Sequence, residues 1–144
     1  MDFLGQYAFD KITSEFGFPD IDLFATLVNT KCKTFVYPER YALATDAFTI
    51  NWSTYFFYAF PPFAMILKML NKIIHDKAKG IVIVPHWPIQ PWYPVFKSLI
   101  IGKELIFESN NLLIESPFRT RHRLSPHLSL IAAIVCGKPT RKNF

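Results

Sequence analysis

The fold is decided by residues 55–84, which read YFFYAFPPFAMILKMLNKIIHDKAKGIVIV. Residues 55–60 are almost wholly apolar, as in a strand that is buried on both faces of a parallel sheet. Pro61 and Pro62 suit the first turn of a helix, where the missing proline amide costs nothing. Residues 63–77 place apolar side chains on one helical face and most charged ones off it, so we expect a helix there.

A second strand follows this helix. We expect Gly80 to end the helix and residues 81–84 to form the next buried strand, which predicts a right-handed parallel crossover. Outside this unit we expect a helix at 3–16, ended by Gly17 and Pro19; strands at 21–25, 34–37 and 46–52; a short helix at 95–100; and strands at 104–108 and 112–115, joined by a hairpin turn at 110–111. Residues 128–135 fit a short helix or a strand equally well.

Alternating strands and helices of this kind predict an α/β fold, in which helices cover both faces of a mostly parallel sheet. We expect this domain to span residues 1–116, followed by a basic C-terminal extension over residues 117–144. In such folds ligands bind beyond the carboxyl ends of the strands. The distinctive residues of the sequence fall at that predicted edge.

The composition is that of a folded domain with a mild positive charge. Apolar residues make up 51% of the chain and aromatic residues 17%, which excludes a disordered chain. The net charge of +5 favours phosphate-rich partners, but only as a long-range field. The cysteines and histidines form no metal-binding spacing, and the most apolar run is too short to span a bilayer. We therefore expect an intracellular protein with no metal and no membrane partner.

The residues Phe60, Pro61, Pro62 and Phe63 end the expected central strand. Base-amino methyltransferases place an Asn or Asp, two prolines and an aromatic residue at such a strand end. The polar side chain and the first proline's carbonyl accept hydrogen bonds from the target amino group, and the aromatic ring stacks on the flipped base. Pro61, Pro62 and Phe63 fit this catalytic pattern, but Phe60 stands where the acceptor belongs. A proline-started helix explains the same residues without any site.

Three further residues are candidates for cofactor binding. Asp22 and Ala25 lie near the end of the first expected strand, where a carboxylate can bind the amino or hydroxyl groups of a cofactor such as S-adenosylmethionine. Asp46 is placed to face an adenine ring. A cap or turn role explains a lone acidic residue at a strand end without any site, and the signal from Asp46 alone is equally weak. The sequence has no glycine-rich phosphate loop, which disfavours nucleotide binding of that kind.

Two features are candidates for nucleic-acid binding. Trp87 and Trp92 lie in a proline-stiffened loop, which fits either a stacking platform for bases or a lid packed on the core. Arg119, Arg121 and Arg123 begin a tail without acidic residues, which fits either contact with a phosphate backbone or a solvated end.

The order of these motifs carries a resemblance to a known family. The motifs are residues 17–25 (GFPDIDLFA), Asn29, residues 46–48 (DAF), Trp52, and residues 58–63 (YAFPPF), 80–85 (GIVIVP) and 87–94 (WPIQPWYP). In this order they resemble a segment of DIRS-type retroelement polyproteins over about residues 15–100. That segment lies downstream of the reverse transcriptase and ribonuclease H domains and before the tyrosine recombinase, and it is similar to phage-type adenine-N6 DNA methyltransferases.

The resemblance implies a Rossmann-like, methyltransferase-type sheet, with Asp22 on the cofactor-binding strand and residues 60–63 as the catalytic motif. Because of Phe60 we expect no working catalysis and no bound cofactor. Three functions stay open. The first is an accessory domain of a polymerase polyprotein, which binds DNA or RNA beside the neighbouring reverse transcriptase and ribonuclease H domains. The second is an S-adenosylmethionine-dependent adenine-N6 DNA methyltransferase. The third is a structural spacer packed on the polymerase domains.

Overall fold

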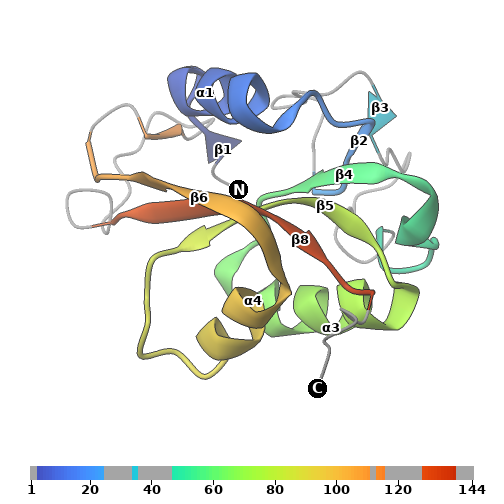
Figure 1. Cartoon of the computed structure of the whole chain (residues 1–144). Coiled ribbons are helices and arrows are strands. Elements are labelled where there is room, and N and C mark those ends of the chain that lie inside the picture. Colours follow the sequence, from blue (N-terminus) through green and yellow to red (C-terminus); the bar gives the residue numbers. More distant parts are fainter. Residues whose placement is uncertain (1–2, 25–33, 36–46, 111–112, 116–127, 139–144) are drawn as a thin grey trace.

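The predicted strand–helix–strand unit forms the centre of the structure (Figure 1). This computed structural model describes residues 3–24, 34–35, 47–110, 113–115 and 128–138. Strands β4 (Phe56–Ala59) and β5 (Lys79–Pro85) pair in parallel. The chain between them forms the short 3₁₀ helix η2 (Phe63–Met65) and then α3 (Ile66–Asp76). The two strands and the helix predicted from residues 55–84 are therefore confirmed.

The main sheet has six strands. Their spatial order is β3 (Thr34–Phe35), β2 (Ile21–Asp22), β4, β5, β8 (Leu130–Cys136) and β6 (Ile100–Phe107). The first four strands are parallel. β8 is antiparallel to both of its neighbours, so β6 runs in the same direction as β5. The element left open at 128–135 is thus a strand, and it lies inside the sheet although it comes from the expected C-terminal extension.

Helices cover both faces of this sheet (Figure 1). Helix α1 (Gln6–Phe16) packs on one face, and α3 and α4 (Tyr93–Leu99) lie on the other. The α1-side core contains Leu4, Ala8, Phe9, Ile12, Tyr58, Ile81, Ile83, Phe107, Leu113, Leu128, Leu130 and Ala132. The α3-side core includes Phe57, Ala59, Ile66, Met69, Leu70, Ile73, Val82, Val84, Phe96, Ile131, Ala133 and Val135. The predicted α/β class is confirmed.

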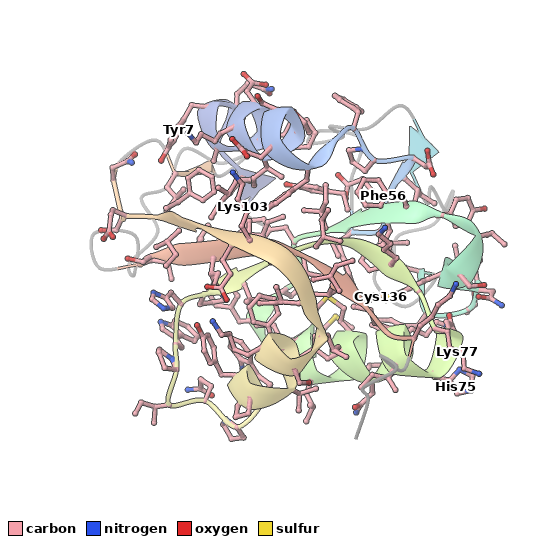
Figure 2. The ribbon with its side chains drawn as sticks, in the orientation of Figure 1. Tyr7, Phe56, His75, Lys77, Lys103 and Cys136 are labelled. Carbon is pink, nitrogen blue, oxygen red and sulfur yellow. The ribbon has the colours of Figure 1, made fainter. Side chains whose placement is uncertain are left out.

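Strand residues alternate between these two cores. Tyr58 points to the α1 side, whereas Phe57 and Ala59 point to the α3 side, as the two-residue period of a strand requires. At the sheet edge, Lys103 of β6, which is labelled in Figure 2, forms an ion pair with Glu15 of α1. This pair links the edge strand to the helix that covers it.

The first residues of the chain differ from the prediction. The expected helix at 3–16 begins only at Gln6, because β1 (Phe3–Leu4) pairs antiparallel with β7 (Ile114–Glu115) in a separate two-stranded sheet. The predicted hairpin between 104–108 and 112–115 is therefore wrong, since β6 pairs with β8 instead. Apolar patterning identifies which residues are buried, but it does not identify the partner strand.

The predicted strand at 46–52 is wrong over residues 47–52. Turns there lead into the 3₁₀ helix η1 (Trp52–Thr54). The indole Nε1 of Trp52 donates a hydrogen bond to the Ala47 carbonyl at 2.8 Å, and Oδ1 of Asn51 accepts one from the Ser53 amide at 2.8 Å. Such local bonds from side chains compete with strand pairing.

The predicted helix end at Gly80 is also wrong. Helix α3 ends at Asp76, and Lys77 adopts the left-handed conformation with φ of 54°, where its amide donates to carbonyls of the last helical turn. Gly80 lies in β5 instead. A Cβ atom there would come within 2.4 Å of the Phe57 ring, so glycine is needed for close packing between neighbouring strands.

Candidate functional site

The sheet brings the main predicted site residues to one edge. Asp22 is opposite Tyr58 in the parallel β2–β4 pair, and Ala59 is opposite Val82 in the β4–β5 pair. Because these three neighbouring strands are parallel, the residues that follow them emerge at the same carboxyl edge. That edge therefore carries Asp22, the motif at 60–63 and the loop that starts after Pro85. Ala25 and Asp46, the other predicted cofactor residues, lie outside the described residues.

Asp22 is buried, with 4% of its surface exposed. Its Oδ1 accepts a hydrogen bond from the Phe24 amide at 3.3 Å, so the carboxylate stabilises the turn that ends β2. Asp22 therefore has the turn role that was one of its two interpretations from the sequence. A carboxylate at this position also lies at the edge where such folds bind ligands.

The motif after β4 forms the start of the next helix. Pro61 is buried, and the Pro62 carbonyl accepts a hydrogen bond from the Met65 amide at 2.9 Å, which closes η2. Phe60 is partly exposed and packs against the α1-side core. Phe63 is partly exposed and packs against both cores. The motif thus presents two aromatic rings and no side-chain hydrogen-bond acceptor.

The loop after β5 contributes a third ring. The Phe63 and Trp87 ring centroids are 5.2 Å apart and the rings meet edge to face, at 77°. Trp87 is partly exposed and, like Phe63, contacts both cores. We call Phe60, Phe63 and Trp87 the edge aromatic cluster. Nothing in the sequence spacing indicated that Phe63 and Trp87 touch, because they follow different strands.

The two predicted stacking residues are placed differently. Trp92 is 7% exposed, belongs to the α3-side core and packs against Tyr93 with centroids 5.8 Å apart. Trp92 is therefore a core residue, whereas Trp87 is partly exposed at the carboxyl edge. His86 lies beside Tyr93, with ring centroids 6.0 Å apart. The loop between the two tryptophans is exposed to solvent at Ile89, which is 93% exposed.

The remaining site predictions concern charge and metals. Arg119, Arg121 and Arg123 lie outside the described residues. Within the described ranges, no group of three or more His, Cys, Asp or Glu side chains could hold a metal ion. In the same part of the chain, none of the helices is long and apolar enough to cross a membrane.

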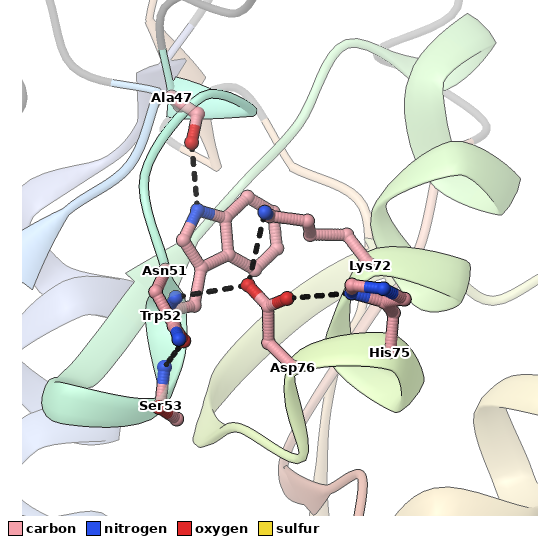
Figure 3. A network of polar contacts seen from close by, with 7 residues as sticks. All are labelled: Ala47, Asn51, Trp52, Ser53, Lys72, His75 and Asp76. Carbon is pink, nitrogen blue, oxygen red and sulfur yellow. Dashed lines mark hydrogen bonds and ion pairs between the residues drawn. The ribbon is translucent and has the colours of Figure 1, made fainter.

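A polar network missed by the sequence analysis joins η1 to α3 (Figure 3). Asp76, in the last turn of α3, accepts a hydrogen bond from the Trp52 amide at 2.9 Å. It also forms an ion pair with Lys72 at 3.0 Å. Nδ1 of His75 lies 2.9 Å from the other carboxylate oxygen. The spacing of Lys72 and Asp76 could have indicated the ion pair, but no signal links Asp76 to a residue 24 positions earlier.

We expect the Asp76 carboxylate to make stability depend on acid pH. Burial raises its pKa, but the hydrogen bonds from Trp52, His75 and Lys72 outweigh burial and hold the pKa below its usual range. A group whose pKa is lower in the folded state stabilises the fold above its unfolded pKa, and this contribution is lost as the pH falls through the folded pKa. Wild-type protein should therefore lose stability below about pH 4.

The test is urea denaturation of wild type and Asp76→Asn at pH 7 and at pH 3. At pH 7 we expect Asp76→Asn to lose about 1–3 kcal/mol of unfolding free energy, because hydrogen bonds to a charged acceptor are weakened. At pH 3 the difference should shrink. Asp10→Asn, at an exposed position on α1, is the control and should leave the pH profile unchanged. An unchanged profile in Asp76→Asn would contradict the assignment.

The comparisons with known proteins add no relative. No protein-family model matches the sequence, and no curated protein sequence matches it.

Proposed function

We propose that this chain is the methyltransferase-type domain of a DIRS-type retroelement polyprotein, that it no longer transfers methyl groups, and that it binds nucleic acid. The observation that carries the proposal is the meeting of two motifs at one edge. Asp22 ends β2, and Phe60 to Phe63 follow the neighbouring parallel strand β4. These are the two segments that the resemblance to adenine-N6 methyltransferases implies as the cofactor strand and the catalytic motif.

The order of the strands supports the same proposal. The resemblance implies a mostly parallel, Rossmann-like sheet. Here β3, β2, β4 and β5 are parallel neighbours, and β8 runs antiparallel between β5 and β6. β4, which carries the proline motif, lies between β2 and β5, in the middle of the parallel part of the sheet.

The identity of residue 60 supports the absence of catalysis. Methyl transfer to a base amino group needs acceptors that orient the nitrogen toward the methyl group. A phenylalanine ring offers no such acceptor, and Phe60 packs on the α1-side core. The two prolines and Phe63 of the motif remain, so the missing part is the group that would align the amine.

The edge aromatic cluster supports nucleic-acid binding. Phe63 and Trp87 are partly exposed at the carboxyl edge, and stacking of a base on an aromatic ring contributes about 1–3 kcal/mol. The net charge of +5 adds long-range attraction to phosphates. In the parent polyprotein, the reverse transcriptase and ribonuclease H domains are the proposed neighbours.

Fluorescence anisotropy with a labelled single-stranded DNA tests the binding. We expect affinity to fall with salt, Trp87→Ala to bind about tenfold more weakly, and alanine at Arg119, Arg121 and Arg123 to reduce the salt slope. Phe18→Ala is the matched control, because Phe18 is 60% exposed and follows α1, outside the aromatic cluster. Equal affinity of wild type and Trp87→Ala would place the binding surface elsewhere, and no binding would overturn the proposal.

The second candidate is an active S-adenosylmethionine-dependent adenine-N6 methyltransferase, which the buried Asp22 and the retained Pro61 favour. Calorimetric titration of S-adenosylmethionine separates the two candidates. The proposed function expects no saturable binding and no methyl incorporation into DNA. Saturable binding that is lost in Asp22→Ala but kept in the exposed control Asp10→Ala would favour the enzyme.

A further inference from the structure

A group of exposed lysines lies at the amino edge of the sheet, away from the carboxyl edge that carries the motifs. Lys77 comes just before β5, Lys79 is the first residue of β5, and Lys138 comes just after β8. Because β5 and β8 are antiparallel, the start of β5 and the end of β8 meet at the same edge. We call Lys77, Lys79 and Lys138 the basic edge. The length of β5 separates it from the loop after Pro85 by about 20 Å.

Backbone pairing holds the basic edge together. Lys79 is opposite Cys136 in the β5–β8 pair. Beyond this pair, the Gly137 amide donates a hydrogen bond to the Ala78 carbonyl at 2.7 Å. The other two lysines of the basic edge are each one residue away from this bond. The three ammonium groups are therefore carried by neighbouring segments with a fixed backbone.

The basic edge differs from the other described lysines in its lack of partners. Those lysines have an acidic or aromatic side chain close by: Lys72 has Asp76, Lys97 has Glu104, Lys103 has Glu15, Lys68 lies over the Phe48 ring, and Lys11 is one helical turn before Glu15 on α1. Within the described residues, the lysines of the basic edge form no ion pair, and all three are exposed. The unpaired positive charge of the described chain therefore gathers at one place.

The nearest acidic side chains do not neutralise the basic edge. Asp76, at the end of α3, is bonded to Lys72 and to the Trp52 amide. Asp20 comes before β2, two strands away from β5, and its carboxylate accepts a hydrogen bond from the Phe56 amide at 3.0 Å. The surplus at this edge is therefore positive.

Stabilisation of α3 explains only part of the basic edge. A cation near the C-terminal end of a helix interacts favourably with the helix dipole, and Lys77 directly follows α3. Lys79 lies in β5 and Lys138 follows β8, so neither belongs to that helix end. Their exposure without a partner is typical of a surface that receives anions.

We infer that the basic edge binds the phosphate backbone of duplex DNA, on a surface separate from the carboxyl edge. Lysine binds phosphate as a point charge, and such contacts do not depend on base sequence. A duplex keeps its bases stacked inside, so it presents phosphates to the basic edge and no free base to Phe63 or Trp87. The inference goes beyond the proposed function, which rests on base stacking at the carboxyl edge.

Fluorescence anisotropy with a short labelled DNA duplex, measured over a series of salt concentrations, tests the inference. Each phosphate contact contributes about 0.9 to the slope of log affinity against log salt. The triple variant Lys77→Gln, Lys79→Gln and Lys138→Gln should therefore have a slope smaller by about 2–3, and bind about tenfold or more weakly at low salt. Thermal unfolding checks that it is folded. Should the triple variant unfold, Lys138→Gln alone should still lower the slope by about 1.

The matched control removes the same net charge elsewhere. It combines Lys11→Gln, Lys68→Gln and Lys103→Gln, and it should keep most of the wild-type slope. Trp87→Ala should bind the duplex as wild type does, because the aromatic ring meets no free base there. Equal losses in the two triple variants would overturn the inference, since net charge alone would then explain the binding. An equal loss in Trp87→Ala would also overturn it.

The remaining outcomes separate this inference from the proposed function and from a lipid partner. No binding of wild type to the duplex would overturn the inference, whether or not single-stranded DNA binds. The same holds if wild type binds phosphatidylserine vesicles but not the duplex. Single-stranded binding that Trp87→Ala leaves unchanged would count against the proposed function, while loss of duplex binding in the basic-edge variant would still support the inference.

Discussion

Of Gly17, Gly80, Gly102 and Gly137, the last is where replacement by alanine is expected to cause the largest loss of stability. An alanine Cβ at Gly137 would lie 2.0 Å from the Ile73 carbonyl oxygen and 3.0 Å from the Cα atom of Ile74. Both are backbone atoms at the end of α3. The Gly137 amide also donates to the Ala78 carbonyl at 2.7 Å, so the two segments cannot separate without losing this bond.

The expected loss of unfolding free energy depends on whether the atoms near the new methyl group can move aside. Overpacking costs about 1–3 kcal/mol where side chains shift aside. Backbone atoms at a helix end cannot shift in this way, so we expect about 4 kcal/mol or more. A typical domain is stable by about 5–15 kcal/mol, so Gly137→Ala should have a much lower thermal midpoint or no cooperative unfolding transition. Urea and thermal denaturation measure this directly.

Gly17→Ala is the matched control for this substitution. Gly17 has a positive φ of 97° but no atom within 4 Å of a Cβ position. Its replacement by alanine should cost only the strain of a backbone conformation that favours glycine, about 1–3 kcal/mol. A loss in Gly137→Ala no larger than that in Gly17→Ala would show that Gly137 and the end of α3 are not in close contact.

Local patterning in the sequence was enough to predict the centre of the fold. Residues 55–84 combine a buried strand, two helix-starting prolines and an amphipathic helix, and each of these signals lies within a few residues. Residues 128–135 were ambiguous because they are almost uniformly apolar, which suits a buried helix as well as a buried strand. Only pairing with β5 and β6 makes this segment a strand, and both partners are distant in the sequence.

Some features of the candidate site could likewise be predicted from the sequence, and others could not. The edge shared by Asp22 and the motif at 60–63 follows from parallel neighbouring strands, so it could be predicted. The contact of Phe63 with Trp87 and the bond from the Trp52 amide to Asp76 depend on how loops pack, and no local signal encodes them. The sequence also did not distinguish Trp87, which is partly exposed, from Trp92 in the core.

Gly80→Ala should have the second largest effect, and a second substitution should partly reverse it. A Cβ atom at Gly80 would lie 2.4–2.5 Å from atoms of the Phe57 ring. Phe57 is fully buried and contacts Trp52 with ring centroids 5.6 Å apart, so its ring has little room to move. We expect Gly80→Ala to cost about 3 kcal/mol, at the upper end of overpacking.

A double-mutant cycle with Phe57→Leu tests whether this ring is the cause. Phe57→Leu alone should destabilise the protein, because it removes packing against Trp52. The double variant should nevertheless lose less unfolding free energy than the two single variants lose together, by about 1 kcal/mol or more. The reason is that leucine leaves space for the new methyl group. Strict additivity in urea denaturation would mean that the Phe57 ring does not exclude a side chain at position 80. The need for glycine at position 80 would then require another explanation.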